Sequence, residues 1–487
     1  MRKGFLIMLA VVLVAALAAP AMAGLDVTGF VRDKGYVSNF KNGATAPVLQ
    51  KDAPAAAYVE QRFRAKFSFG EENVKAVWFV ETDFGAFGDS AGSAVPANTT
   101  GGAFRNSGGA LGGDRINLET KNIYIWFKLP NTSLDFTVGL QNVSDAYAGL
   151  LFGASDMAGI FAKGKFEPVD YVLGWSKFYE NSNLKADDMT LYVASAKFAP
   201  TKDVKLGLNF YFLQDDTGKV STANQLPFGT STISPALFGS AVTNLNKKRI
   251  YTPGVDVSFN AGPATVSGFA LYQFGKVDFL DNTSDVDVKG FAADLRGDMN
   301  VGPGKFFLEG LYVSGGDNVA NEYKSIVTLN DVNASPGGNS FFARTDMMIL
   351  LPNGDDINTS SALVGAAGVA TGGNTSPGNG GRGIWHVAAG YTQKLGDKLT
   401  GKVGAGYLAA TKLLLTDQGG ATFATTKKGK GMGTEVNANV NYNIMKGLDF
   451  GVYAAYAWLG DYFKSSLAGA VDPDDVYDVH FRLNYAF

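Results

Sequence analysis

The chain has 487 residues and no cysteine, and its 42 basic and 45 acidic side chains give a formal net charge of −3 with neutral histidines. This balance offers no basic patch large enough for nucleic acid, which is therefore excluded as a partner. Without disulfides, stability must come from the fold itself.

The N-terminal segment predicts a secretory signal peptide over residues 1–23. Arg2 and Lys3 precede the apolar run FLIMLAVVLVAALAA, and Ala21 and Ala23 occupy the small-residue positions of a cleavage site. No cysteine follows the expected cleavage point, so lipid attachment there is excluded. The alternative is an uncleaved membrane anchor, which needs about 20 apolar residues.

Alternating apolar and polar residues predict β-strands throughout the rest of the chain. The clearest case is TEVNANVNYNIM, which places Glu and Asn on one parity and apolar residues on the other. We expect 18 strands, or 16 if the two segments that alternate most weakly, 25–39 and 157–166, are not strands. The expected strands are 25–39, 56–69, 74–85, 114–129, 133–143, 157–166, 168–179, 188–199, 203–214, 249–260, 264–279, 286–299, 304–316, 383–395, 398–411, 432–445, 447–460 and 475–487.

The connections between these strands alternate in length. Short turns such as GEEN, PNTS, PTKD, NAGP, LGDK and MKG alternate with long loops rich in Gly, Ser, Asn and Asp. Such sorting is typical of an outer-membrane barrel, in which the short turns are periplasmic, whereas a soluble sandwich has no reason to sort its loops. The longest loops are 86–113, 215–248, 317–382 and 412–431.

The C-terminal segment DVYDVHFRLNYAF keeps one apolar face up to its last residue. Termini of soluble proteins are usually frayed and polar. Together with the signal peptide, this ending resembles the Gram-negative outer-membrane porins, whose final strand ends in a Phe that the barrel-assembly machinery reads. The resemblance assigns this assembly signal to Phe487, with Tyr485 and Phe481 on the same face.

The resemblance implies an all-β fold, a closed antiparallel transmembrane β-barrel that forms a single domain over residues 24–487. The expected protein is integral to the outer membrane, surrounded by its lipid, and encloses a water-filled channel for passive diffusion of small hydrophilic solutes and ions. The resemblance also implies a homotrimer. No cofactor, metal or enzymatic activity is expected.

In such a barrel the apolar parity faces lipid and the polar parity faces the lumen, because hydrocarbon cannot satisfy polar side chains. Closing the hairpin over Glu71 and Glu72 places Arg62 opposite Glu81. This wall is either self-neutralising or a basic strip that guides ions. The predicted pore lining is Glu60, Arg62, Arg64, Lys66, Lys75, Glu81, Asp83, Asp294, Arg296, Glu435, Asn437, Asn439 and Arg482.

The loop 317–382 far exceeds the roughly 12 to 15 residues above which an unstructured loop is unusual. It contains RTDMMILLPNGDD, whose apolar run would promote association if it were exposed. We therefore expect it to fold into the barrel mouth as a constriction. The rival constriction is the loop SDAYAGLLFGAS at 144–155, and the remaining alternative is a mobile or trimer-contacting cap. The charged candidates of the long loop are Arg344, Asp346, Asp355 and Asp356.

Three other functions share parts of this pattern. A substrate-specific channel for carboxylates or sugars would share every feature described above. Inward aromatics would stack on sugar rings in such a channel, and otherwise they only fill space beneath a folded loop. A barrel that sheathes a multihaem cytochrome would have the same strands. An outer-membrane enzyme would need His386 and His480, which lie four strands apart in the expected order and would not meet across one hairpin. The segment DNTSDVD at 281–287 has oxygen ligands for calcium but lacks the pattern of an EF-hand loop. The inward aromatics are Tyr124, Trp126, Tyr211 and Tyr453.

Overall fold

A computed structural model describes most of the strands and parts of the loops. No helix in this part is long and apolar enough to cross a membrane. The segment 1–23, with Ala21 and Ala23, lies outside the described residues, and so do Asp355 and Asp356. The described residues are 24–40, 49, 51–84, 87, 118–180, 183–216, 245–279, 285–317, 322–329, 342, 344–352, 377–413, 428–464 and 472–487.

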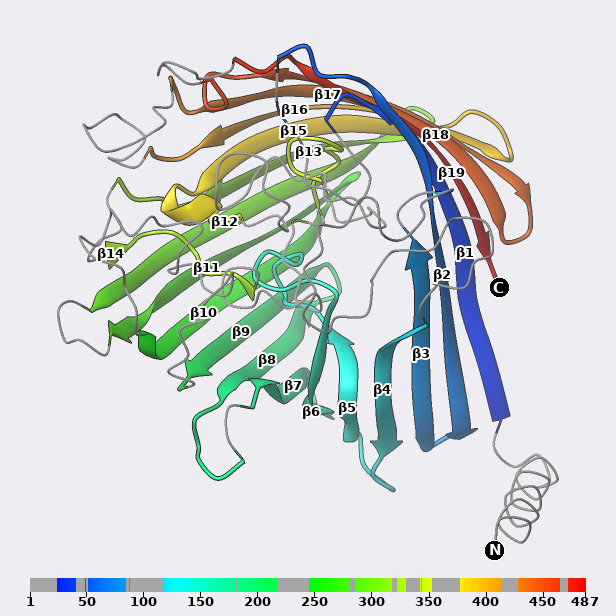
Figure 1. Cartoon of the computed structure of the whole chain (residues 1–487). Helices are drawn as coiled ribbons and strands as arrows, with labels where there is room; N and C mark the ends of the chain where they lie inside the picture. The colour runs from blue at the N-terminus through cyan, green and yellow to red at the C-terminus, as the bar shows by residue number, and fades with distance from the viewer. Residues whose placement is uncertain are drawn as a thin grey trace, which may run out of the picture.

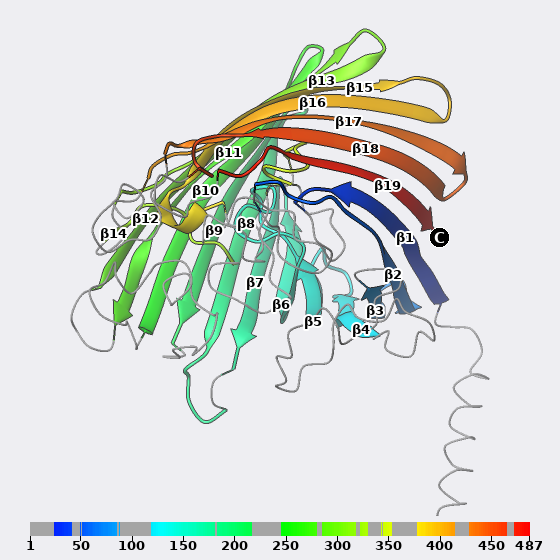
Figure 2. The same cartoon turned by 45° about the horizontal axis from the view of Figure 1, so that its top comes forward.

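The described strands form one closed antiparallel barrel, shown in Figures 1 and 2. The sheet has 19 strands; the two-residue β14 (Glu322–Tyr323) pairs in parallel with β12, so the wall itself has the 18 strands predicted. A short 3-10 helix, η2 (Asn379–Gly381), precedes β15. The wall strands are β1 (Gly24–Ser38), β2 (Ala56–Glu71), β3 (Val74–Phe84), β4 (Glu119–Lys128), β5 (Asp135–Val143), β6 (Ser155–Phe166), β7 (Val169–Tyr179), β8 (Met189–Thr201), β9 (Val204–Asp215), β10 (Leu245–Ala261), β11 (Ala264–Phe279), β12 (Val286–Val301), β13 (Gly304–Val313), β15 (Ile384–Lys394), β16 (Leu399–Ala410), β17 (Gly431–Met445), β18 (Leu448–Leu459) and β19 (Val476–Ala486).

The first and last strands close the barrel. β1 pairs with β2 on one side and with β19 on the other, in a register that runs from Phe30 opposite Ala486 to Ser38 opposite Asp478. Figure 1 shows the C-terminus beside β1. Closure leaves no sheet edge, as hydrocarbon requires, because an unpaired backbone group in lipid costs several kcal/mol.

Side-chain alternation sorts the two faces of the wall. On β17, Val436, Val440 and Tyr442 are exposed on the outer face, whereas Glu435 and Asn437 on the opposite parity are buried inside. Stacked rings run across four neighbouring strands of the outer face, with centroids 5.7, 4.6 and 5.3 Å apart. Such aromatic belts are typical of the interface levels of a membrane barrel. The four rings are Tyr192, Phe212, Tyr251 and Phe274.

Two glycines of β1 lie beneath aromatic rings of the C-terminal segment. A Cβ added at Gly35 would collide with the ring of Phe481, and one added at Gly29 would lie 2.9 Å from Phe487 Cζ and would also collide with the Arg64 carbonyl oxygen. The backbones of Gly29 and Phe487 exchange two N–H···O hydrogen bonds of 3.0 Å. The closing seam therefore requires glycine where the terminal ring packs.

Gly29→Val tests this requirement. The added side chain has no room beside the Arg64 carbonyl, so β1 must move away from β2, and overpacking of this kind costs about 1–3 kcal/mol. We expect less folded barrel, measured as the heat-modifiable band on SDS gels. Gly297→Val is the matched control, because nothing lies within 4 Å of a Cβ at that position on β12. Equal folded fractions in the two variants would contradict the requirement.

Candidate functional site

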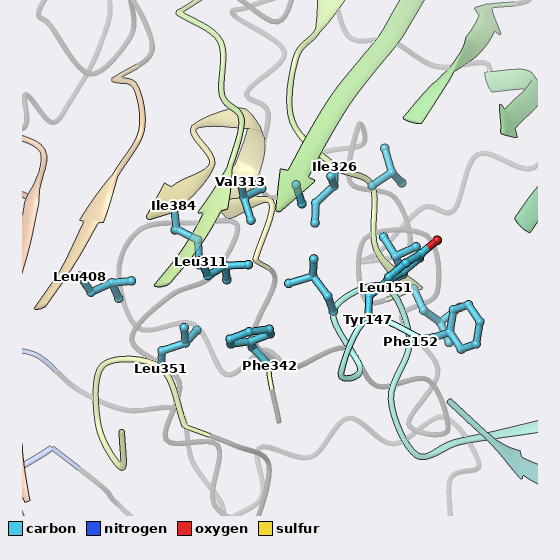
Figure 3. Packing of buried hydrophobic residues seen from close by; sticks show 14 of the residues in the cluster. Tyr147, Leu151, Phe152, Leu311, Val313, Ile326, Phe342, Leu351, Ile384 and Leu408 are labelled. Atoms are coloured by element: carbon cyan, nitrogen blue, oxygen red, sulfur yellow. The ribbon is translucent and has the colours of Figure 1, made fainter. Parts of the chain in front are cut away.

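Three chain segments fold inward and pack against the inner face of the wall. We call residues 144–154, 325–329, 342 and 344–352 the inner layer. Its apolar side chains, among them Tyr147, Ile326 and Phe342, are buried, and they meet inward side chains of the wall such as Leu311 and Ile384. Figure 3 shows this packing in close view. The inner layer is held by apolar burial over much of its length.

The segment 344–352 is fastened to β17 by one carboxylate. Glu435 accepts hydrogen bonds from the backbone N–H groups of Met348 (2.6 Å), Ile349 (3.0 Å) and Leu350 (2.9 Å). Asn437 on the same strand donates to the Asp346 carbonyl at 2.9 Å and to Glu435 at 3.0 Å. Glu435 is fully buried. It therefore provides the backbone of an irregular segment with acceptors that a neighbouring strand would otherwise supply.

The charged side chains of this segment pair with the wall. Arg344 forms an ion pair of 2.7 Å with Asp294 and donates to Ser267 Oγ at 2.6 Å. Asp346 pairs with Lys402 on β16. Arg296 donates to the Arg344 carbonyl at 2.8 Å. These contacts bring four of the predicted site residues together beneath or within one segment: Asp294, Arg296, Arg344 and Asp346.

The segment 144–154 is organised around Asp145. The Asp145 carboxylate accepts four backbone N–H bonds of 2.6–2.9 Å, from residues 147, 149, 151 and 152. Burial raises the pKa of Asp145 to about 6, and the four backbone N–H groups oppose this shift. Leu329 N donates to the Leu151 carbonyl at 2.8 Å, and Gln273 bonds both the N–H and the carbonyl of Val327. Both loops considered as constrictions thus form one layer.

The wall formed by β1, β2 and β3 carries a separate charged cluster. Glu81 pairs with Arg62 at 3.3 Å and also with Arg64. The predicted register was wrong by two residues, because the hairpin turns over residues 72 and 73 and pairs Glu71 with Val74. Arg64 therefore lies opposite Glu81, and Arg62 lies opposite Asp83. The Arg62–Glu81 ion pair is diagonal.

The other predicted lining residues lie at several levels of the wall. Glu60 is buried opposite Lys34, whereas Lys66 is half-buried and Lys75 is exposed. Asn439 accepts a hydrogen bond from Asn441 at 2.9 Å. The Arg482 guanidinium lies 5.0 Å from the ring centroid of Tyr453. The side chain of Asp83 is outside the described part of the chain.

Comparison with known families identifies the chain. The sequence profile of the family described as "Porin subfamily" matches residues 193–478, more than half of the chain. The chain belongs to this porin family. It is therefore an outer-membrane channel for small solutes, and membership indicates a channel rather than an enzyme.

Solved structures agree with the porin fold. Acinetobacter baumannii OccAB4 is 12% identical, with a TM-score of 0.51 over 95% of this chain and 98% of that chain. Pseudomonas aeruginosa OpdQ is 10% identical, with a TM-score of 0.50 over 95% of this chain and 97% of that chain. At these identities the similarity concerns the fold alone. No curated protein matches the porin sequence significantly.

The residues considered for other functions have structural partners in the porin. His386 on β15 lies 3.4 Å from Glu309 and packs against Phe342. His480, four strands away on β19, stacks on Tyr453 of the neighbouring β18. Tyr211 accepts a hydrogen bond from Ala146 N, so it lies beneath the inner layer. Among the described residues no cluster suits a metal ion, and residues 281–284 lie outside them.

Sequence reasoning placed Glu435 among the pore-lining residues and did not foresee that it binds the inner layer. It also missed Asp145 and Gln273. The only available signal was an acidic residue at the start of a loop, Asp145 before AYAG, which is a common arrangement for side-chain capping of a turn.

Glu435→Gln should release the segment 344–352. The amide offers one acceptor oxygen in place of two, and an unpaired buried N–H costs about 1–3 kcal/mol. We expect a larger single-channel conductance in planar bilayers from a barrel that remains heat-modifiable. Asn439→Ala on the same strand is the control, because Asn439 accepts its hydrogen bond from Asn441 within β17. Unchanged conductance in Glu435→Gln would show that the carboxylate does not hold the segment.

Proposed function

We propose that this porin conducts small hydrophilic solutes and ions by passive diffusion, driven by their gradients, without any cofactor. The observation that supports this is the one-sided filling of the barrel. The hydrogen bonds and ion pairs between the inner layer and the wall run to strands from β9 to β17, whereas the cluster of Arg62, Arg64 and Glu81 lies on β2 and β3. The channel then passes between the inner layer and this charged wall, and 344–352 sets its narrowest part.

The charge pattern supports weak ion selectivity. The wall near β2 combines two guanidinium groups with one carboxylate. The edge of the inner layer adds Arg344 and Asp346, and Lys402 of β16 lies beside Asp346. Pores of extreme selectivity are lined by rings of one sign. Mixed signs favour a general channel whose preference is set by the local excess of arginine.

Export and assembly complete the proposal. Residues 1–23 act as a cleaved signal peptide, and the barrel-assembly machinery recognises the C-terminal face of Phe481, Tyr485 and Phe487. The folded position of Phe487, stacked 6.5 Å from Phe63 at the seam, gives the same residue a second role in closure. The mature barrels associate as a homotrimer in outer-membrane lipid.

Arg62→Ala should change selectivity more than stability. Because Arg64 remains beside Glu81, we expect the free energy of unfolding to fall by about 1 kcal/mol or less. Removing one lumen cation should shift the reversal potential in a KCl gradient toward cation selectivity. Arg249→Ala removes the same charge from an ion pair with Asp216 on the outer parity of β10 and serves as the control. Equal reversal potentials in wild type and Arg62→Ala would place the permeation path elsewhere.

Deleting residues 326–377 tests the constriction directly. Ser325 Oγ donates to the Gly378 carbonyl at 3.0 Å, so the two cut ends already lie side by side and can be joined without moving the wall. We expect higher single-channel conductance and altered selectivity, because the deletion removes the segment 344–352. An unchanged channel, from protein with normal heat-modifiable mobility, would mean that the segment lies outside the permeation path.

A further inference from the structure

The outer face of β7–β12, on the side of the barrel away from the closing seam, carries an apolar groove with a volume of about 870 Å³ (Figure 1). Short side chains form its floor along two lines. Ala194 and Ala196 on β8 form one line, and Pro253 on β10 with Ala270 on β11 forms the other. Long exposed side chains flank these lines, so the groove consists of two furrows: Leu173, Leu208, Phe210, Tyr272 and Phe291.

The wall changes polarity in regular rows above this groove. Two residues from Pro253 along β10, toward the long loops, Tyr251 belongs to the aromatic belt of four stacked rings. Two residues further, Arg249 lies directly opposite Lys276 of β11. Lys289 on β12 lies at the level of the belt. Because two residues of a strand span about 7 Å, the outer face passes from apolar groove to cations within about 14 Å.

The acidic partners of these cations lie mostly farther from the hydrocarbon. Asp216 and Asp285, which pair with Arg249 and Lys276, lie just beyond the ends of β9 and β12. Asp287 lies at the cations' own level, opposite Lys276. The Lys276 side chain is 50% exposed, and exposed ion pairs are weak. Since two cations directly opposite each other repel, a further anion at this level would stabilise the row.

We propose that this surface binds a phosphorylated lipid with several acyl chains, of the lipid A type, from the outer leaflet. The long loops of a porin lie on the outer side, so lipids of that leaflet place their phosphates toward these loops and their chains toward the middle of the membrane. The wall follows the same order, with Arg249 and Lys276 at the phosphate level and the two furrows below the aromatic belt. Charge and shape together thus complement one lipid molecule.

Selection of this lipid requires more than apolar surface. Hydrocarbon already surrounds the barrel, so burying another apolar group against the wall brings no hydrophobic gain. The selection comes from charge, because basic side chains attract phosphates at a membrane surface, and from the close packing of chains in the furrows. A zwitterionic lipid receives the same packing without the net attraction, and it therefore binds more weakly.

Native mass spectrometry of the delipidated full-length barrel in mild detergent tests the furrows, with lipid A as the probe. Ala194→Trp fills the furrow on β8, and we expect about tenfold weaker binding because the chain loses its contacts there. Ala405→Trp is the matched control, since Ala405 is exposed on the outer parity of β16 and does not line the groove. Unchanged binding to Ala194→Trp, or an equal loss in both variants, would overturn the proposal.

The head-group contact is tested on the exposed rim, where folding is not at risk. In Arg249→Gln with Lys276→Gln, we expect about tenfold weaker binding of lipid A and unchanged binding of phosphatidylethanolamine. Lys398→Gln with Lys446→Gln is the control, because it removes the same charge from two exposed turns at the other end of the barrel. Equal lipid A affinities in the two double variants, or tighter binding of phosphatidylethanolamine than of lipid A by wild type, would overturn the proposed site.

Discussion

Hydrocarbon supplies no hydrogen-bond partner to a peptide group, and the whole architecture depends on that constraint. A sheet in such a medium must close on itself, so the register between β1 and β19 matters as much as any hairpin. In this chain the seam is made specific by close approach. Gly29 and Gly35 of β1 leave space for the rings of Phe487 and Phe481 at the C-terminus. The two glycines therefore fit β1 to the aromatic residues of the C-terminal segment.

The same constraint reappears inside the barrel. The inner layer has few strand partners, yet its backbone groups are buried against the wall and must still be paired. Three side chains take the place of a neighbouring strand: Asp145, Gln273 and Glu435. Apolar burial holds the layer against the wall. Gln273 and Glu435, which belong to the wall, determine where along it the layer rests, and Asp145 fixes the shape of the segment 144–154. A carboxylate suits the task because its two oxygens accept several N–H groups at once.

The period of two in the sequence was enough to predict 18 strands with ends within a few residues, because lipid and water impose opposite polarity on successive side chains. The same periodicity did not predict the register between β2 and β3. Moving the turn from residues 71 and 72 to 72 and 73 shifts every cross-strand pair by two, which preserves parity and leaves no mark on the pattern. The weak alternation of 25–39 had a specific cause, since Asp33 stands on the apolar parity.

The contents of the lumen could not be predicted in the same way. A polar residue at an inward position indicates only that its side chain has a polar partner in the lumen. The backbone of a folded loop can be that partner as well as water can. Glu435 and Asn437 bind peptide groups, whereas Arg62 and Arg64 surround a carboxylate, although all four occupy inward positions of the same alternating type. What distinguishes them is the loop that arrives from more than 80 residues away, as in the bond from Leu350 to Glu435. Local periodicity therefore determines the wall of the barrel, whereas long-range packing of the loops against that wall determines the shape of the pore.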